Sequence, residues 1–264
     1  MPDLRVAYIQ TGLSWEDKTA NLKRFDGHFA KLNEKADLII LPEMFNTGFS
    51  INPEAFAEGM EGEGVAYLLK KAGDLDAVII GSLLVKTGEG FFNRLVAVHP
   101  GGKVEMYDKR HLFRLSEEYR IISGGGQRLV VKVKGWNIRP LVCYDLRFPV
   151  WSKNSYTDDK YEYDVLVYVA NWPASRSHVW KTLLAARAME NQVYCIGVNR
   201  IGEDGHGTFH SGDSMAVDSK GNILSSAPLG EEAVNIVTLS KQDLEVYRGS
   251  FTVGMDWDRF KIEL

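Results

Sequence analysis

The stretch from residue 164 to residue 199 restricts the fold of this chain more than any other part of the sequence. Residues 164–170 (DVLVYVA) form a continuous apolar run, which is typical of a strand covered on both faces. The tripeptide NWP then ends the strand, residues 177–191 repeat apolar side chains at helical spacing, and residues 193–198 are apolar again. Because two buried strands joined by a helix form a parallel βαβ unit, we predict an α/β fold, with Ser177 capping the helix.

The same alternation of strands and helices extends over most of the chain. We expect a helix at residues 17–36 and strands at residues 4–10, 38–41, 77–85, 91–98, 104–107 and 137–142. Turns at residues 86–90 and 218–222 predict hairpins, so the sheet is expected to be mixed. Since no linker or repeat divides the sequence, we expect one domain over residues 1–264. Its tail, from about residue 250 to 264, is rich in aromatic residues and is expected to pack on its own domain or on a partner subunit.

The charge balance excludes several classes of partner. The chain has 31 Lys and Arg residues against 35 Asp and Glu residues, a formal charge of −4, so it has no broad cationic field for nucleic acid or anionic lipid. Residues 1–5 carry charges where a secretion signal is apolar, and no run approaches the roughly 18 apolar residues of a membrane span. We therefore expect a cytoplasmic protein whose two cysteines, Cys143 and Cys195, are reduced.

Chemically useful side chains follow four of the predicted strands. Glu43, Lys109, Cys143 and Asn171 each come within about two residues of a strand's carboxyl end, where open α/β sheets bind their ligands. Taken singly, such residues are more often solvated loop residues or small buried thiols. Together they supply a nucleophile, a base and a cation for an oxyanion, which are the groups that acyl transfer needs. Cys195 lies inside an apolar strand and is expected to be a core thiol.

Three motifs identify a family. The chain resembles the nitrilase, or carbon-nitrogen hydrolase, superfamily in LPEMF at 41–45, YDKRHL at 107–112 and CYDLRFP at 143–149, in the family's order and spacing. NWP at 171–173 and ARAMEN at 186–191 also match, so the resemblance spans nearly the whole chain. It is most similar to the omega-amidase branch, which acts on monoamides of dicarboxylic keto acids. The resemblance implies a four-layer α-β-β-α sandwich with mixed sheets and a homodimer or larger assembly, and we expect no cofactor.

Carried over position by position, the resemblance implies a role for each catalytic residue. Glu43 is expected to act as general base, Lys109 as oxyanion stabiliser, and Cys143 as the nucleophile that forms a thioester. The family has a second glutamate after the lysine motif. In this chain Glu117 and Glu118 are both candidates, and the spacing to the glycine pair at 124–125 favours Glu118.

The predicted chemistry is also consistent on physical grounds. A free thiol has a pKa of about 8.5, so a nearby Lys109 would favour the thiolate while Glu43 accepts the proton. We expect the backbone N–H of Tyr144, directly after the nucleophile, to be a second oxyanion donor. A substrate carboxylate requires a cation that binds it through two hydrogen bonds, and three arginines lie near strand ends. The residues expected to contact the substrate are Phe45, Arg147, Trp172 and Arg176, with Arg200 as a third candidate arginine.

Other functions remain open at this point. The substrate is alternatively another small amide, an N-carbamoyl compound or a nitrile, and a non-catalytic ligand-binding relative keeps the same fold. A metal hydrolase is disfavoured because glycines flank His206 and His210 and argue against a helix that would bring them together. A Cys–His protease is disfavoured because the papain-like and caspase-like signatures are missing around Cys143.

Overall fold

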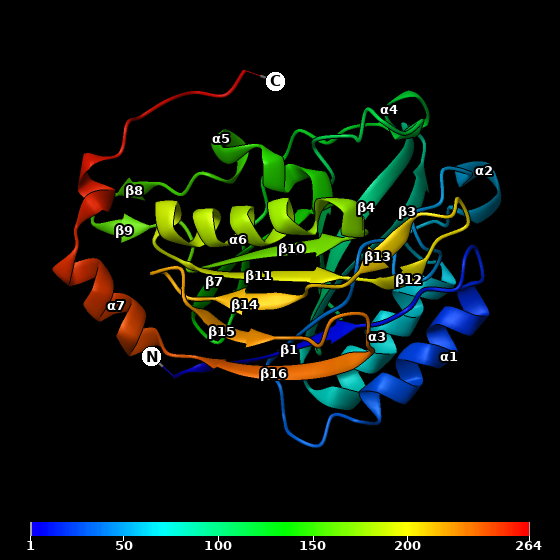
Figure 1. Ribbon diagram of the computed structural model, residues 1–264, viewed down its shortest axis with the longest axis horizontal. Helices are drawn as coiled ribbons and strands as arrows, with labels where there is room; N and C mark the ends of the chain where they lie inside the picture. The colour runs from blue at the N-terminus through cyan, green and yellow to red at the C-terminus, as the bar shows by residue number, and fades with distance from the viewer. Residues whose placement is uncertain (1, 264) are drawn as a thin grey trace.

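Two six-stranded mixed sheets face each other in the computed structural model, which describes residues 2–263 (Figure 1). The first sheet has the order β16-β1-β2-β3-β4-β5 and the second the order β15-β14-β11-β10-β7-β6. The strands of the first sheet are β1 (Leu4–Gln10), β2 (Leu38–Ile40), β3 (Val78–Thr87), β4 (Gly90–Val98), β5 (Val104–Asp108) and β16 (Ala233–Leu239). Those of the second are β6 (Val131–Val133), β7 (Trp136–Val142), β10 (Val165–Ala170), β11 (Tyr194–Asn199), β14 (Met215–Val217) and β15 (Ile223–Ser226).

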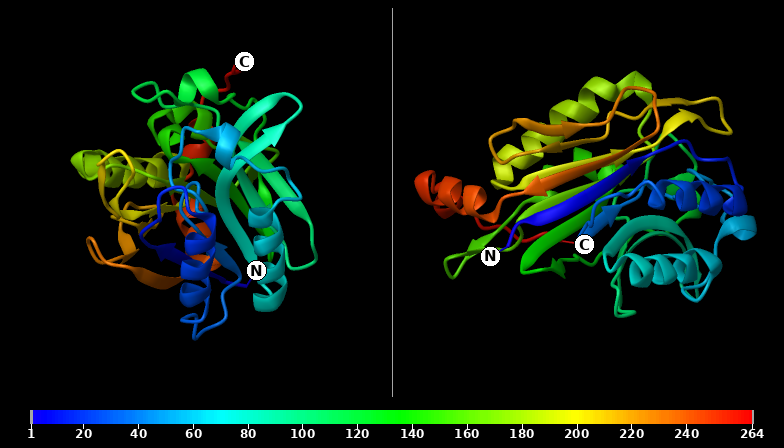
Figure 2. Two further views of the ribbon diagram at one scale, coloured as in Figure 1. Left: turned by 90° about the vertical axis from the view of Figure 1, so that its right-hand side faces the viewer. Right: turned by 90° about the horizontal axis from the view of Figure 1, so that it is seen from below.

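Helices α1 (Lys18–Phe29) and α3 (Glu63–Leu75) cover the outer face of the first sheet and α6 (Ser177–Asn191) covers that of the second, whereas α7 (Lys241–Ser250) lies at one end of the molecule (Figure 1 and Figure 2). The short elements are α2 (Pro53–Phe56), α4 (Glu118–Ile121), α5 (Pro149–Ser152), the 3₁₀ turns η1 (Cys143–Arg147), η2 (Ala174–Arg176) and η3 (Val253–Asp256), and the hairpins β8 (Tyr156–Thr157) with β9 (Lys160–Tyr161) and β12 (Ile201–Glu203) with β13 (Phe209–Ser211). The predicted four-layer α-β-β-α sandwich is confirmed.

The side chains of β1 point alternately into the two hydrophobic cores that separate the layers of the sandwich. Val6 and Tyr8 belong to the core between the two sheets, whereas Ala7 and Ile9 belong to the core under α1 and α3. Since successive side chains of a strand point to opposite faces, one apolar strand supplies both cores. This explains why the predicted strands are continuously apolar.

The predicted βαβ unit is present as β10-α6-β11, and β10 pairs in parallel with β11. The helix lies very close to β11, because a Cβ at Gly197 would be 2.5 Å from side-chain atoms of Leu184 and Trp180. The prediction that Ser177 caps α6 is wrong. The turn η2 leads directly into the helix, so Ser177 already has helical backbone angles and is the first residue of α6.

Two further segments differ in extent from their predictions. Helix α1 ends at Phe29 instead of residue 36, since residues 33–35 are exposed and carry the chain toward β2. The C-terminal tail contacts its own domain through Trp257, whose ring lies 3.7 Å from Lys153 Nζ and 5.7 Å from the ring of Tyr161. Within residues 2–263, no helix is long and apolar enough to cross a membrane.

Candidate active site

Cys143 lies at the carboxyl end of β7, on the first residue of η1, and it lines a cavity of about 470 Å³. Its φ angle is +44°, a left-handed conformation that is uncommon and strained for a residue with a Cβ. Asp145 holds this turn in place: its Oδ2 accepts hydrogen bonds from the Val142 N–H (3.0 Å) and the Tyr107 hydroxyl (2.7 Å), and its Oδ1 accepts one from the His111 N–H (3.0 Å). The position of the thiol is therefore fixed by the surrounding chain.

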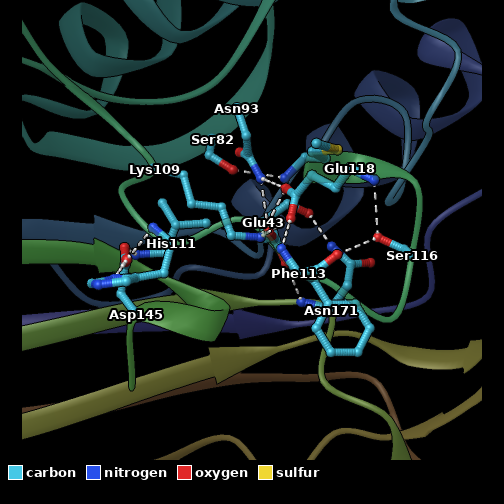
Figure 3. Close-up of polar contacts among 12 residues, drawn as sticks. Glu43, Ser82, Asn93, Lys109, His111, Phe113, Ser116, Glu118, Asp145 and Asn171 are labelled. Atoms are coloured by element: carbon cyan, nitrogen blue, oxygen red, sulfur yellow. Dashed lines mark hydrogen bonds and ion pairs between the residues drawn. The ribbon is translucent and has the colours of Figure 1, made fainter. Parts of the chain in front are cut away.

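A buried cluster of three charged side chains lies beside this turn (Figure 3). Lys109 Nζ donates to Glu43 Oε1 at 2.9 Å and to the two carboxylate oxygens of Glu118 at 2.9 and 3.0 Å. All three side chains are almost completely excluded from solvent. They come from the ends of β2 and β5 and from α4, so residues up to 75 positions apart form one ionic site.

Glu43 is held from the second sheet as well. The backbone N–H of Asn171, at the end of β10, donates to Glu43 Oε2 at 2.8 Å, and the Asn171 side chain donates to the Glu43 carbonyl at 2.6 Å. From β4, Asn93 Nδ2 donates to Glu43 Oε1 at 2.8 Å. Asn93 was not among the predicted site residues, and the signal for it is a single amide side chain within the apolar run of residues 91–98.

The charges in this cluster act on the thiol in opposite directions. Burial raises the pKa of Cys143, and the negative charge of Glu43 raises it further, whereas Lys109 and a backbone hydrogen bond from Asn171 lower it. Burial acts to lower the pKa of Lys109, but the carboxylates of Glu118 and Glu43 outweigh it and raise that pKa. In this arrangement Cys143 rests as a neutral thiol beside a permanent cation, and a base must take its proton when it attacks.

The cavity wall contains three of the four residues predicted to contact the substrate. The Arg147 guanidinium lies 5.1 Å from the ring centroid of Trp172, and that of Arg176 lies 5.4 Å from that of Phe113. Within residues 2–263, neither arginine forms an ion pair with a carboxylate. Tyr144, the predicted oxyanion donor, also lines the cavity.

Two predicted contacts lie elsewhere. Phe45 is completely buried in the core under α1, where its ring packs 5.7 Å from that of Phe25. Met44 has a φ of +46° and turns the chain back, so Phe49 forms the cavity wall instead, 5.2 Å from Lys109 Nζ. The third candidate arginine, Arg200, is buried and donates to the carbonyl groups of Leu13, Ile201 and Glu203, so it supports loops and does not line the cavity.

Comparison with known proteins settles the family. The sequence model of the carbon-nitrogen hydrolase family matches residues 5–249. The chain belongs to the carbon-nitrogen hydrolase family. It is 43% identical to the omega-amidase YafV of Escherichia coli (strain K12) over 263 residues, which is 99% of this chain and 100% of that protein. It is 29% identical to the 2-oxoglutaramate amidase of Bacillus subtilis (strain 168), over 91% of this chain and 93% of that protein. The predicted family, its omega-amidase branch and the enzyme class are confirmed.

Solved structures of carbon-nitrogen hydrolases have the same architecture. A CN-hydrolase superfamily protein of Xanthomonas campestris, solved with an arsenic adduct in its active site, superposes with a TM-score of 0.96 at 40% identity, covering 100% of both chains. Nit3 of Saccharomyces cerevisiae, a nitrilase superfamily member, superposes with a TM-score of 0.83 at 24% identity over 94% of each chain. The second likeness concerns the fold alone.

The structure also decides among the other residues that the sequence singled out in this carbon-nitrogen hydrolase. Of the glutamate doublet, Glu118 is buried against Lys109, whereas Glu117 is half exposed and pairs with Arg120 on the surface. His206 and His210 line the cavity, but residues 2–263 contain no group of three or more His, Cys, Asp or Glu side chains arranged to hold a metal ion. Cys195 is completely buried in β11, away from the cavity lining.

Proposed function

We propose that this carbon-nitrogen hydrolase is an omega-amidase, which hydrolyses the carboxamide of a small monoamide of a dicarboxylic 2-oxo acid and releases ammonia. One observation carries the proposal: Cys143 and the buried Glu43, Lys109 and Glu118 cluster meet at a cavity whose wall also holds Arg147 and Arg176, neither of which pairs with a carboxylate among residues 2–263. Reactive groups for an amide and cations for a free carboxylate are therefore present in one cavity. The relatives named omega-amidase and 2-oxoglutaramate amidase support the same substrate class.

In the first half-reaction Glu43 accepts the proton of the Cys143 thiol, and the sulfur attacks the amide carbon. The oxygen that becomes negative is stabilised by the Lys109 ammonium and by the backbone N–H of Tyr144, and one such donor contributes about 3 kcal/mol. Collapse of this intermediate breaks the carbon–nitrogen bond. The leaving amine takes its proton from Glu43, with Glu118 stabilising the charged cluster, and ammonia leaves a thioester on Cys143.

The second half-reaction uses the same groups, with water as the nucleophile and Cys143 as the leaving group. Water enters at the position that ammonia has left, Glu43 takes one of its protons, and the hydroxyl attacks the thioester carbon. Lys109 stabilises the oxyanion again, Cys143 leaves with the proton from Glu43, and the product acid releases its remaining proton to solvent and departs as a carboxylate. The scheme is ping-pong, and it needs no group beyond this chain and water.

The substrate is bound through its free carboxylate, at the end opposite the amide. A dicarboxylic monoamide has one carboxylate left free, and a guanidinium binds a carboxylate through two parallel hydrogen bonds. Arg147 and Arg176 are both held against aromatic rings, which limits their conformations before the substrate arrives. Trp172 and Phe113 thereby help to set the distance between the bound carboxylate and Cys143.

A substrate panel with two cysteine variants tests the proposal. Ammonia release should be fastest with 2-oxo acid monoamides, slower with glutamine-like amides, and weak with N-carbamoyl compounds and nitriles. Cys143→Ala should abolish turnover and the acyl adduct in the intact-protein mass spectrum, while the matched variant Cys195→Ala should retain both. Near-normal turnover by Cys143→Ala, or release of no ammonia from any amide by the wild type, would contradict the proposal.

We also propose a cytoplasmic location and a homodimeric or larger assembly. Two buried, unpaired cysteines are compatible with a reducing compartment. Half-exposed apolar side chains gather at the C-terminal end, including Phe251, Met255 and Phe260, and such surfaces are commonly covered by a partner subunit. Gel filtration with light scattering should give at least twice the mass of one chain, and a chain truncated before Phe251 should shift toward the monomer.

A further inference from the structure

Asn93 is a buried polar residue in the middle of β4 that touches both carboxylates of the charged cluster. Its Nδ2 donates to Glu43 Oε1 at 2.8 Å and lies 3.4 Å from Glu118 Oε1. Within residues 2–263, it is the only uncharged side chain with a hydrogen bond to both (Figure 3). It does not line the cavity, so it has no direct contact with substrate.

Packing does not explain why an amide occupies this position. The neighbouring residues of β4 include the buried apolar Phe92, Leu95 and Val96, and Asn93 itself is completely excluded from solvent. Its Oδ1 has no hydrogen-bond partner in the described part of the chain, and a buried acceptor without a partner destabilises the folded protein. An apolar residue of similar size would avoid that penalty. The side chain is therefore accounted for by what its Nδ2 contacts.

We propose that Asn93 is a positioning residue, which fixes the carboxylates of Glu43 and Glu118 on the two sides of the Lys109 ammonium. The inference rests on the proposed cysteine-dependent amidase chemistry. Glu43 Oε1 accepts from Lys109 and Asn93, and Glu43 Oε2 accepts from the Asn171 N–H. A carboxylate has about four lone-pair sites, so these three donors leave one site on Oε2 for the thiol proton of Cys143.

Loss of Asn93 should affect catalysis without affecting binding. In Asn93→Leu the Glu43 carboxylate loses one of its three donors, so kcat should fall about 10- to 100-fold, as expected for a lost hydrogen bond to a charged group. The KM should stay within about twofold, because the residue has no access to the cavity. Asn93→Asp has the same shape, and its carboxyl group donates a hydrogen bond only when it is protonated. Its activity relative to Asn93→Leu should therefore rise as the pH falls.

The thiol itself gives a second readout that needs no substrate. The titratable groups next to Asn93 are Glu43, Glu118 and Lys109, and Cys143 adjoins Glu43. Since the amide donor favours the ionised carboxylates, its removal should move the acid limb of Cys143 alkylation by iodoacetamide to higher pH by about one to two units. Peptide mapping would separate Cys143 from the buried Cys195.

The experiment compares wild type, Asn93→Leu, Asn93→Asp and Ser82→Ala in both assays. Ser82 is an equally buried polar residue on the adjacent strand β3; its Oγ accepts from the Met44 N–H and contacts neither carboxylate. Ser82→Ala should keep the wild-type acid limb even if its kcat changes.

An unshifted limb or unchanged kcat in folded Asn93→Leu would overturn the inference. If Asn93→Leu does not fold, wild-type values for Asn93→Asp at all pH values would overturn it. Absence of ammonia release by wild type would refute the omega-amidase proposal alone, because alkylation still tests Asn93.

Discussion

Replacement of Lys109 by methionine tests whether the buried cluster is balanced by a single cation. Lys109 Nζ lies within 3.0 Å of three carboxylate oxygens of Glu43 and Glu118, and all three side chains are almost completely buried. Removing one partner from a buried ionic group costs about 3–5 kcal/mol. With an unfolding entropy of about 2.1 cal/mol/K per residue over 264 residues, this predicts a Tm lower by about 5–9 °C. If Lys109 is the oxyanion donor that we propose, its loss should also lower kcat by about 100- to 1000-fold.

The pH dependence of the loss in Tm distinguishes an electrostatic effect of Lys109→Met from a packing effect. Burial raises the pKa of Glu118, Lys109 opposes that rise, and Glu43 adds to it, so removing Lys109 raises it further. A carboxyl group with a raised folded-state pKa destabilises the protein above that pKa, and the penalty disappears as the pH falls through it. The Tm difference between wild type and Lys109→Met should therefore narrow from pH 8 to pH 5.

Differential scanning calorimetry with a surface control provides the assay. Lys86 pairs with Glu54 at 3.7 Å, and both side chains are mostly exposed, so Lys86→Met should change stability by less than about 0.5 kcal/mol. A Tm loss in Lys109→Met no larger than in this control, or a loss that widens toward pH 5, would refute the electrostatic reasoning.

Substitutions at three other residues have specific expected effects on binding or stability. Arg176→Glu should raise KM for carboxylate-bearing amides about tenfold or more with a smaller change in kcat, and an unchanged KM in steady-state assays would exclude Arg176 from carboxylate binding. Gly197→Ala, whose Cβ would lie 2.5 Å from Leu184 and Trp180, should lower the unfolding free energy in urea by about 1–3 kcal/mol, whereas Gly88→Ala, with open space around it, should not. Burial, followed by the charge of Arg200, lowers the pKa of His210 to about 4, so wild-type stability should fall between about pH 6.5 and pH 4 by up to about 3 kcal/mol. In His210→Gln that slope should flatten, and an unaltered slope in urea titrations would be inconsistent with a buried neutral imidazole.

The sequence predicts those parts of the fold that follow from the spacing of apolar residues and from the positions of strand ends. The apolar runs located most strands of both sheets, and α6 begins and ends at the predicted residues. The rule that ligands bind beyond the carboxyl ends of strands brought Glu43, Lys109, Cys143 and Asn171 into one expected crevice. In the structure Lys109, Cys143 and Asn171 line the cavity, and Glu43 lies directly behind them, hydrogen-bonded to Lys109 and Asn171.

The remaining features depend on contacts that linear spacing does not encode. Phe45 is the last residue of the LPEMF motif, two positions after Glu43, but the left-handed turn at Met44 directs it into the core. Ser177 has a side chain suited to capping, yet η2 supplies the preceding turn. Arg200 follows a strand end as the cavity arginines do, and only its three carbonyl partners distinguish it.

The charged cluster and the proposed nucleophile come from different sheets. Glu43, Lys109 and Glu118 belong to the first sheet and its connections, whereas Cys143 and Asn171 end strands of the second. Neither half of the sandwich contains a complete site, so catalytic competence is created only when the two halves dock in register. During refolding, a chain with all its secondary structure but undocked sheets would be inactive. Enzymatic activity therefore reports whether the two sheets have docked in register.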